Sequence, residues 1–281
     1  MSKRWFKEKK REHYYRLAKK ENYRSRAAYK LKQLQFRFNV IHPGWLVVDL
    51  GASPGGWSQV AVELVDRRGM KGKVVAVDIA RMKPIEGVTV LRGDMREKTA
   101  AEEVRSALGG RDADAVISDM SPDISGTYSI DHARSVELSG IALKFAQKVL
   151  RPGGNFVVKV FQGELFPGFL REVRRSFKNV RANRPPASRS QSSETYVVAK
   201  GFDPKRREPG AGGRGPGEGT ERDPGSLRPL TSRARLGPED ISGCLPGRGG
   251  LGENGPVLQG RETGDLRREK VGKKAGKDEE E

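Results

Sequence analysis

Cysteine is almost absent from this chain of 281 residues, in which Cys244 is the one thiol. A single cysteine cannot form a disulfide within the chain or build a cysteine-based metal site. The three histidines, His13, His42 and His132, are scattered without the spacing of metal ligands, so no metal is expected. The sequence also lacks any run approaching the roughly 18 apolar residues of a membrane span, and its basic N-terminus has no apolar signal core. We therefore expect a cytoplasmic protein without a membrane segment.

Aromatic residues are missing from residues 203–281, where glycine and proline recur every few positions. Such a composition cannot bury enough apolar surface to offset the entropy lost on ordering. We predict a disordered tail over 203–281, and its 16 basic and 15 acidic residues favour a solvated tail over one that contacts RNA. The remaining chain divides into a basic arm or helix over 1–24 and a folded domain over 25–202.

Positive charge is in excess and is concentrated near the N-terminus. The chain has 54 lysine and arginine residues against 36 acidic ones, and residues 1–40 alone hold 14 basic and 3 acidic residues. Such a patch attracts a polyanion and releases counterions on contact. Aromatic residues between these charges could stack on bases, which favours nucleic acid as the partner over a solvated helix that binds nothing. They are Trp5, Phe6, Tyr14, Tyr15, Tyr23 and Tyr29.

Apolar runs alternate between strand-like and helix-like spacing from Ser25 to Phe202. The pattern predicts a first helix over 25–38 with Lys30 at the edge of its apolar stripe. It then predicts strands at 46–50, 73–79, 88–92, 115–118, 155–161, near 178 and at 195–199, with helices at 58–66, 100–108, 132–150 and 168–177. Strands separated by helices pair in parallel through right-handed crossovers. We therefore predict an α/β, Rossmann-like sheet, mostly parallel, with helices on both faces and an antiparallel strand at one edge.

The turn after the first predicted strand is rich in glycine. It reads Asp49-Leu-Gly-Ala-Ser-Pro-Gly-Gly-Trp57, and its glycines, Gly51, Gly55 and Gly56, let the backbone turn sharply and a ligand approach closely. The spacing is neither the dinucleotide signature nor that of the phosphate-binding loop, and the turn has no basic residue to hold a pyrophosphate. The turn therefore favours a cofactor without phosphates.

Acidic residues follow the ends of four predicted strands: Asp49, Asp78, Asp94 and Asp119. Each alone is more often a turn or helix cap, but four at one sheet edge indicate a ligand. S-adenosylmethionine fits this set, because it carries a cationic sulfonium and an adenosine. Asp78 is placed to accept hydrogen bonds from ribose hydroxyls, and Asp94 to accept one from the adenine amino group.

A second set of residues is unusual for a buried sheet edge. Lys159 interrupts the apolar run Phe156-Val-Val-Lys-Val-Phe161, where a lysine is rare unless it has a function. Lys30, Asp119 and Glu194 also lie at or near predicted element ends. Two acids and two lysines beside a cofactor turn indicate catalysis more than packing, although Lys30 could be a surface lysine and Lys159 a snorkelling one.

Five segments of the sequence, considered together, match the motifs of a known family. They are residues 23–31, 49–57, 118–122, 158–163 and 186–202. In this collinear order, over roughly residues 10–202, they resemble the FtsJ/RrmJ-type ribose 2′-O-methyltransferases. The resemblance is closest to the branch that methylates a uridine in 23S ribosomal RNA of the large ribosomal subunit. It implies S-adenosylmethionine as cofactor and this RNA or subunit as partner. We expect a monomer.

The resemblance also implies the roles of individual residues. It puts a catalytic tetrad at Lys30, Asp119, Lys159 and Glu194, and cofactor contacts at Gly55, Trp57, Asp78, Asp94 and Asp119, with Asp49 and Gly51 nearby. We assign Lys159 as the general base that takes the proton of the ribose hydroxyl. Asp119 would hold Lys159, and Glu194 would position Lys30 or the ribose.

Three other readings remain open. An amino-group methyltransferase often has an aromatic residue after the fourth strand, but Asp119-Met-Ser-Pro122 has none. A non-catalytic RNA-binding factor in ribosome assembly would have no need of Lys159. Within the preferred class, transfer RNA is the alternative substrate.

Overall fold

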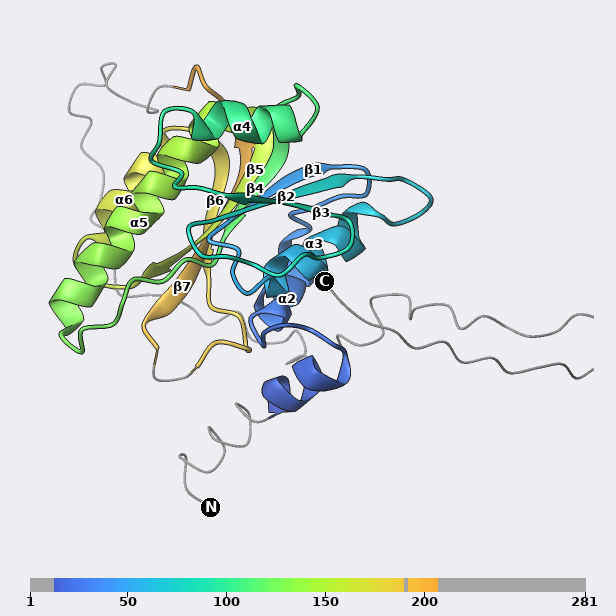
Figure 1. Ribbon diagram of the computed structural model, residues 1–281. Helices are drawn as coiled ribbons and strands as arrows, with labels where there is room; N and C mark the ends of the chain where they lie inside the picture. Colours follow the sequence, from blue (N-terminus) through green and yellow to red (C-terminus); the bar gives the residue numbers. More distant parts are fainter. Residues whose placement is uncertain (1–12, 190–191, 207–281) are drawn as a thin grey trace, which may run out of the picture. The chain divides into compact units, whose positions relative to one another are not determined.

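The computed structural model describes residues 13–189 and 192–206. Most of the predicted N-terminal arm, up to residue 12, and the predicted tail from residue 207 lie outside the described residues. The described part contains a seven-stranded sheet with helices on both of its faces (Figure 1). Among these residues, every helix is too short or too polar to span a lipid bilayer.

The strands run in the order β3-β2-β1-β4-β5-β7-β6. β1 to β5 pair in parallel, whereas β7 runs antiparallel to both of its neighbours, β5 and β6. The predicted fold class is therefore confirmed, and the hairpin of β6 and β7 forms one edge with β6 outermost. The bounds are β1 Leu46–Leu50, β2 Lys73–Asp78, β3 Val88–Arg92, β4 Ala113–Ser118, β5 Leu150–Phe161, β6 Phe177–Asn183 and β7 Glu194–Phe202.

Helices cover the two faces of the sheet in separate groups (Figure 1). The first group packs on one face and comprises α4 Ala100–Ala107, α5 Tyr128–Val149 and α6 Phe166–Arg174. The second group, α2 Ala28–Phe38 and α3 Gly56–Val65, lies on the other face, and residues 13–20 form a further helical segment. Glycine residues in the β1–α3 turn allow α3 to begin at Gly56, directly after the strand.

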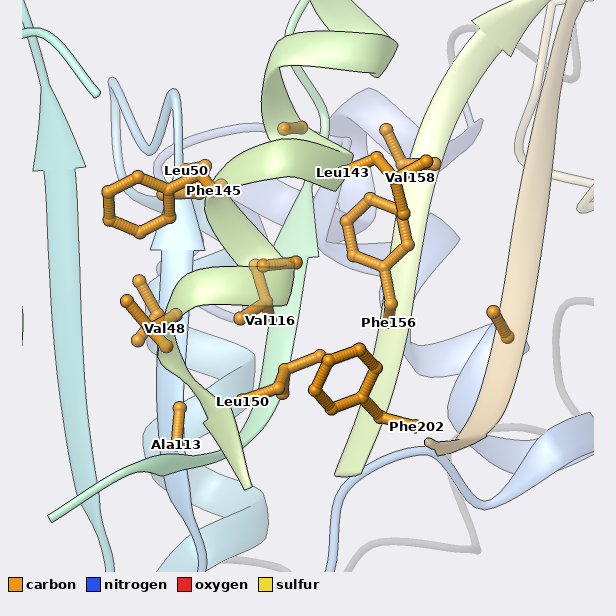
Figure 2. Close-up of a cluster of buried hydrophobic side chains, with 14 of the residues drawn as sticks. Val48, Leu50, Ala113, Val116, Leu143, Phe145, Leu150, Phe156, Val158 and Phe202 are labelled. Atoms are coloured by element: carbon orange, nitrogen blue, oxygen red, sulfur yellow. The ribbon is translucent and has the colours of Figure 1, made fainter. Parts of the chain in front are cut away.

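The hydrophobic core between the sheet and α5 fixes which way each strand residue points. Val48, Val116, Phe156 and Val158 meet α5 residues such as Leu143 in this core (Figure 2). Successive strand residues point to opposite faces, so the residues between them face α2 and α3 instead. This alternation directs Asp49 and Lys159 to the α2–α3 face.

Several predicted boundaries differ from the observed ones by a few residues. α5 begins at Tyr128 rather than at residue 132, because the carboxylate of Asp131 accepts hydrogen bonds from the backbone N–H groups of Ser125 and Gly126 and holds the turn before the helix. β5 begins at Leu150, where α5 ends, although its ladder with β4 is irregular before Asn155. α6 begins at Phe166 because proline is tolerated in a first helical turn.

The prediction that the N-terminal tyrosines are available to stack on bases is wrong for three of them. Tyr14, Tyr23 and Tyr29 are buried, with exposed fractions of 3%, 9% and 4%, and their rings contact one another. They attach the helical segment 13–20 to α2 as part of the core. Tyr15 alone is exposed among the described tyrosines of this group, whereas Trp5 and Phe6 lie outside the described residues.

Candidate active site

The β1–α3 turn is shaped by close approach of other segments. Gly51 and Gly55 both have positive φ, of 66° and 112°, which L side chains rarely adopt. A Cβ atom on Gly51 would lie 2.1 Å from Cγ of Met120, and one on Gly55 would lie 2.4 Å from Cδ1 of Ile85. These two contacts bring the loops after β4 and β2 against the turn, at the carboxyl ends of the strands where ligands bind in such sheets.

Asp49 is the most deeply buried carboxyl group at this edge, with an exposed fraction of 1%. Its Oδ2 accepts a hydrogen bond of 2.6 Å from Ser58 Oγ at the start of α3. The pKa of Asp49 is raised to about 7, chiefly by burial and in part by the charges of Asp119 and Asp78, while hydrogen bonds from Ser58 act to lower it. Asp49 therefore titrates near neutrality and sits below the turn as a packed, hydrogen-bonded group.

Asp78 is the last residue of β2, and Asp94 lies in the segment after β3. The two oxygens of Asp78 accept hydrogen bonds from the backbone N–H groups of Ser53 and Ala80, at 2.8 and 2.7 Å. Asp94 forms an ion pair with Arg96, and side-chain and backbone hydrogen bonds from Arg96 lower the pKa of Asp94. Each oxygen of Asp78 has a second lone pair, so these contacts leave acceptor capacity there. Each oxygen of Asp94 already accepts two hydrogen bonds from Arg96, so a ligand at Asp94 would have to replace some of them.

Arg24 is a residue that the sequence pattern did not single out. Its guanidinium donates hydrogen bonds to the carbonyl oxygens of Pro54, at 3.2 Å, and Lys83, at 2.6 Å. It thereby joins the glycine turn to the loop after β2. An arginine directly before the helical pattern of α2 was the available signal, but its partners lie in loops whose paths the sequence does not reveal.

Lys159 and Asp119 form the centre of a cluster of charged side chains. Lys159 Nζ donates a hydrogen bond of 2.7 Å to the backbone oxygen of Asp119 and lies 3.1 Å from Asp119 Oδ1. Burial acts to raise the pKa of Asp119, but the ammonium groups of Lys159 and Lys30, with hydrogen bonds from Tyr196 and Lys159, outweigh it and lower that pKa. Asp119 is therefore an anion that orients the amine of Lys159.

Lys30 and Glu194 complete the cluster from α2 and β7. Lys30 Nζ lies 3.0 and 3.1 Å from the two oxygens of Glu194 and 3.8 Å from Asp119 Oδ2. The 3.0 Å approach to Glu194 Oε1 is an ion-pair contact without hydrogen-bond geometry, so this buried oxygen has no hydrogen bond to the described residues. The positive charges of the two lysines thus balance the negative charges of the two acids. Glu194 Oε1 is left as an acceptor atom within the site.

Tyr196 is a second residue that the sequence pattern did not single out. Its hydroxyl donates a hydrogen bond of 2.6 Å to Asp119 Oδ1. The ring lies 5.5 Å below Lys30 Nζ and 5.7 Å from the ring of Trp57, whose Nε1 donates to the carbonyl oxygen of Ala27. Burial and the charges of Asp119 and Glu194 raise the pKa of Tyr196, so its hydroxyl stays a donor.

Strand register explains why these side chains meet. Lys159 is paired directly with Tyr196, and Phe161 with Glu194, in the antiparallel ladder of β5 and β7. All four positions share one face because each strand repeats every two residues. Asp119 follows the last residue of β4, and α2 brings Lys30 from the helix layer on that face.

The structure joins the four predicted tetrad residues in one chain of contacts, from Glu194 to Lys30, from Lys30 to Asp119 and from Asp119 to Lys159. Of the predicted cofactor residues, Gly55 directly precedes α3 and Trp57 is buried against Tyr196. Asp78 ends β2, and Asp94 follows the neighbouring strand β3. Among the residues that the structure describes, no three histidine, cysteine or acidic side chains could jointly hold a metal ion.

The model of the FtsJ-like methyltransferase family matches residues 23–202, which include every residue of the cluster. The chain belongs to this family. Two curated relatives named ribosomal RNA large subunit methyltransferase E support the same assignment. The relative from Methanothrix thermoacetophila is 52% identical over 190 residues, covering 68% of this chain and 72% of its own. The relative from Methanosarcina acetivorans is 51% identical over 192 residues, covering 68% and 69%.

A solved structure is similar to this methyltransferase over the same region. It is a Plasmodium falciparum protein provisionally described as a ribosomal RNA methyltransferase, and it is 27% identical with a TM-score of 0.59. The match covers 64% of this chain and 98% of that one. The Rossmann-like fold of this FtsJ-like chain therefore agrees with its family assignment.

Proposed function

We propose that this FtsJ-like methyltransferase transfers a methyl group from S-adenosylmethionine to a ribose 2′-hydroxyl of a uridine in 23S ribosomal RNA. The observation that carries the proposal is the cluster of Lys159, Asp119, Lys30 and Glu194 beside the glycine turn. The names of the curated relatives indicate the RNA substrate, because both are named ribosomal RNA large subunit methyltransferase E.

The donor set at the sheet edge fits S-adenosylmethionine. When bound, this cofactor supplies a methyl group on a positively charged sulfur. Carboxylates at the ends of β1, β2 and β4 and after β3 suit a cation and ribose hydroxyls, and the turn from Asp49 to Trp57 contains no lysine or arginine for a phosphate. Gly51, Gly55 and Trp57 shape the turn, while Asp78 and Asp94 would hold the adenosine.

Lys159 is the proposed general base. Its amine must lose its own proton before it can accept the proton of the ribose 2′-hydroxyl. The carbonyl and carboxylate oxygens of Asp119 fix Nζ at the end of β5, so its lone pair can be aimed at one place. The ribose oxygen would gain the methyl group as the methyl–sulfur bond breaks and leaves its electron pair on sulfur. The hydroxyl proton would pass to Lys159 Nζ, which keeps it until solvent removes it.

Lys30 and Glu194 would prepare the acceptor oxygen. The ammonium of Lys30, held by Glu194, is the positive charge available to stabilise oxyanion character on the ribose as its proton leaves. Glu194 Oε1, which makes no hydrogen bond to the described residues, can accept one from a ribose hydroxyl. Positioning of this kind supplies much of the acceleration of a reaction between two bound partners.

Loss of the amine in Lys159→Ala tests the proposal. We expect methyl transfer to 23S ribosomal RNA to fall by at least about a hundredfold, since general base catalysis contributes roughly that much or more. Binding of S-adenosylmethionine, measured by calorimetry, should persist because Lys159 lies at the acceptor side. The matched control is Lys144→Ala, which removes an exposed lysine of α5.

The product identifies the reaction class. Nucleoside analysis of the treated RNA should give a 2′-O-methylated uridine, whereas a methylated base would indicate an amino-group methyltransferase. Transfer RNA offered as the alternative substrate should remain unmodified. Near-normal turnover in Lys159→Ala would refute the assigned base, and no transfer by the unaltered protein would favour a non-catalytic assembly factor.

A further inference from the structure

A basic groove lies at the outer edge of the sheet, away from the charged cluster. It has a volume of about 360 Å³ and runs between α6 and β6. Its walls carry five cationic side chains beside Phe177, Asn179 and Val180. These cations are Arg171 and Arg174 from α6, Lys178 and Arg181 from β6, and Arg206 after β7.

The segment that forms most of the groove has an excess of positive charge. Residues 171–189 contain seven basic residues and a single acidic one, Glu172, which does not line the groove. None of the five lining cations forms an ion pair with a carboxylate of the described residues. Surface cations that support a fold are commonly interspersed with acids, so this one-sided charge indicates an anionic partner.

The shape of the groove favours a phosphate backbone over a base or a small acid. Arg171, Arg174, Lys178 and Arg181 are all exposed, so the charge is spread along an open surface rather than focused in an enclosed pocket. The one aromatic residue of the lining, Phe177, is fully buried and offers no face for stacking. Exposed cations spread along an open surface suit the phosphates of a nucleic acid, and phosphate contacts carry no sequence information.

Strand geometry places the groove within reach of an RNA whose ribose is at the active site. Arg181 pairs with Val198, and Lys159 pairs with Tyr196 two residues along the same strand, β7. Neighbouring strands lie about 4.8 Å apart and each residue rises about 3.4 Å, so the Cα atoms of Arg181 and Lys159 are separated by roughly 12 Å. A strand of RNA crosses that distance in a few nucleotides.

We infer that the groove between α6 and β6 binds backbone phosphates of the substrate RNA, a few nucleotides from the ribose that is methylated. The inference rests on the proposed function only in taking the RNA to be the methylated substrate. Phosphate contacts at this edge would anchor the RNA while the Lys159 cluster handles a single ribose. Loss of these contacts weakens RNA binding without touching the cofactor site.

The test uses the full chain and a labelled transcript of large-subunit ribosomal RNA, with binding measured at several salt concentrations and without cofactor. Arg174→Gln/Arg181→Gln removes two groove cations. Its matched control, Lys71→Gln/Arg111→Gln, removes two exposed cations before β2 and β4. A second variant, Arg174→Lys/Arg181→Lys, keeps the charges and guards against a general loss of structure.

We expect the glutamine variant of the groove to bind the transcript about tenfold more weakly at low salt. Each lost phosphate contact reduces the slope of log K against log salt by about 0.7 to 0.9, so two should reduce it by about 1.4 to 1.8. The lysine variant should keep the slope, and the control pair should match the unaltered protein. The loss should be equal for transcripts of unrelated sequence, because phosphates carry no sequence information.

Unchanged affinity and slope in the glutamine variant would overturn the inference, and so would an equal loss in the control pair. Tighter RNA binding by the variant would also overturn it, since that result would mean that the groove holds an acidic segment of this chain or another protein. Because binding is read without methyl transfer, an inactive protein would refute the proposed function and leave this result standing.

Discussion

Tyr196 links the charged cluster to the aromatic packing around it. Its hydroxyl donates to Asp119 Oδ1, and its ring lies beneath Lys30 Nζ. We predict that Tyr196→Phe destabilises the fold by about 1.5 to 3 kcal/mol, the usual value of a hydrogen bond to a charged group. Methyl transfer should also slow, because Asp119 becomes freer to move and holds Lys159 less firmly.

Urea unfolding and single-turnover transfer measure the two effects of this change. Tyr15→Phe is the control, because the Tyr15 side chain is about half exposed and donates no hydrogen bond to the described residues. Unaltered single-turnover rates in Tyr196→Phe would show that this hydroxyl does not position the acid.

Asp49 makes the stability of the protein dependent on pH. Its pKa in the fold is about 7, above its ordinary value of 3.8. The folded state therefore binds more protons than the unfolded state between about pH 4 and 7, and stability is lost as pH rises through this window. We predict that Asp49→Asn, which can still accept from Ser58, removes this loss and makes the protein more stable than the unaltered chain above pH 7.

Urea unfolding at pH 5 and pH 8 compares the two proteins. The ratio of their unfolding constants should change with pH. Asp66→Asn, which removes an exposed carboxylate in the turn after α3, is the control for the loss of one negative charge. A parallel pH dependence of Asp49→Asn and the unaltered chain would contradict the raised pKa.

At the scale of elements, α2 is fixed in place by Gln33. Its Oε1 accepts a hydrogen bond of 2.8 Å from the N–H of Ala187 in the β6–β7 loop, and its Nε2 donates 2.9 Å to Tyr14 OH. We predict that Gln33→Ala costs about 1 to 3 kcal/mol, because the N–H of Ala187 stays buried without a partner. Lys30 lies on the same helix, so methyl transfer should fall as well.

Gln147→Ala on α5 is the control for this prediction. Gln147 is exposed and donates to Ser176 Oγ, so its loss should cost less than about 0.5 kcal/mol. Equal unfolding midpoints in urea for the two variants would show that Gln33 does not fix α2.

Strands and helices could be predicted from the sequence because their apolar runs differ in period and are separated by glycine and proline. The proximity of Lys30, Asp119, Lys159 and Glu194 was also predictable, since Lys159 interrupts such a run and a family resemblance supplied the other three positions. Tyr196 and Arg24 were missed because their partners follow from strand register and from loop paths. The buried tyrosines of residues 13–29 were wrongly predicted to be exposed. Charged residues alternate with aromatic ones in the same way whether the aromatic side chains face solvent or pack in the core.

At the scale of the whole molecule, the described sheet ends with β7, and residues 207–281 follow it. The family model stops at residue 202, and the curated relatives match over 190 and 192 residues. Among the described residues, the ion pairs and hydrogen bonds that join Lys30, Asp119, Lys159, Glu194 and Tyr196 form within residues 30–196. We predict that a chain ending at Arg206 keeps its melting temperature, its affinity for S-adenosylmethionine and, within about twofold, its rate of methyl transfer to 23S ribosomal RNA. Ordinary surface substitutions change the free energy of unfolding by about 0.5 kcal/mol or less. A difference of that size between the shortened and the full chain therefore counts as unchanged stability.

The salt dependence of RNA binding separates two roles for residues 207–281. The basic and acidic residues of 207–281 balance, at 14 and 14, so their removal should leave the slope of log K against log salt unchanged. A chain that ends at Arg206 but carries Lys71→Gln/Arg111→Gln gives the reference for an added loss of two charges elsewhere. If the shortened chain instead loses affinity and slope together, residues 207–281 contribute phosphate contacts, and the prediction of a solvated tail is wrong.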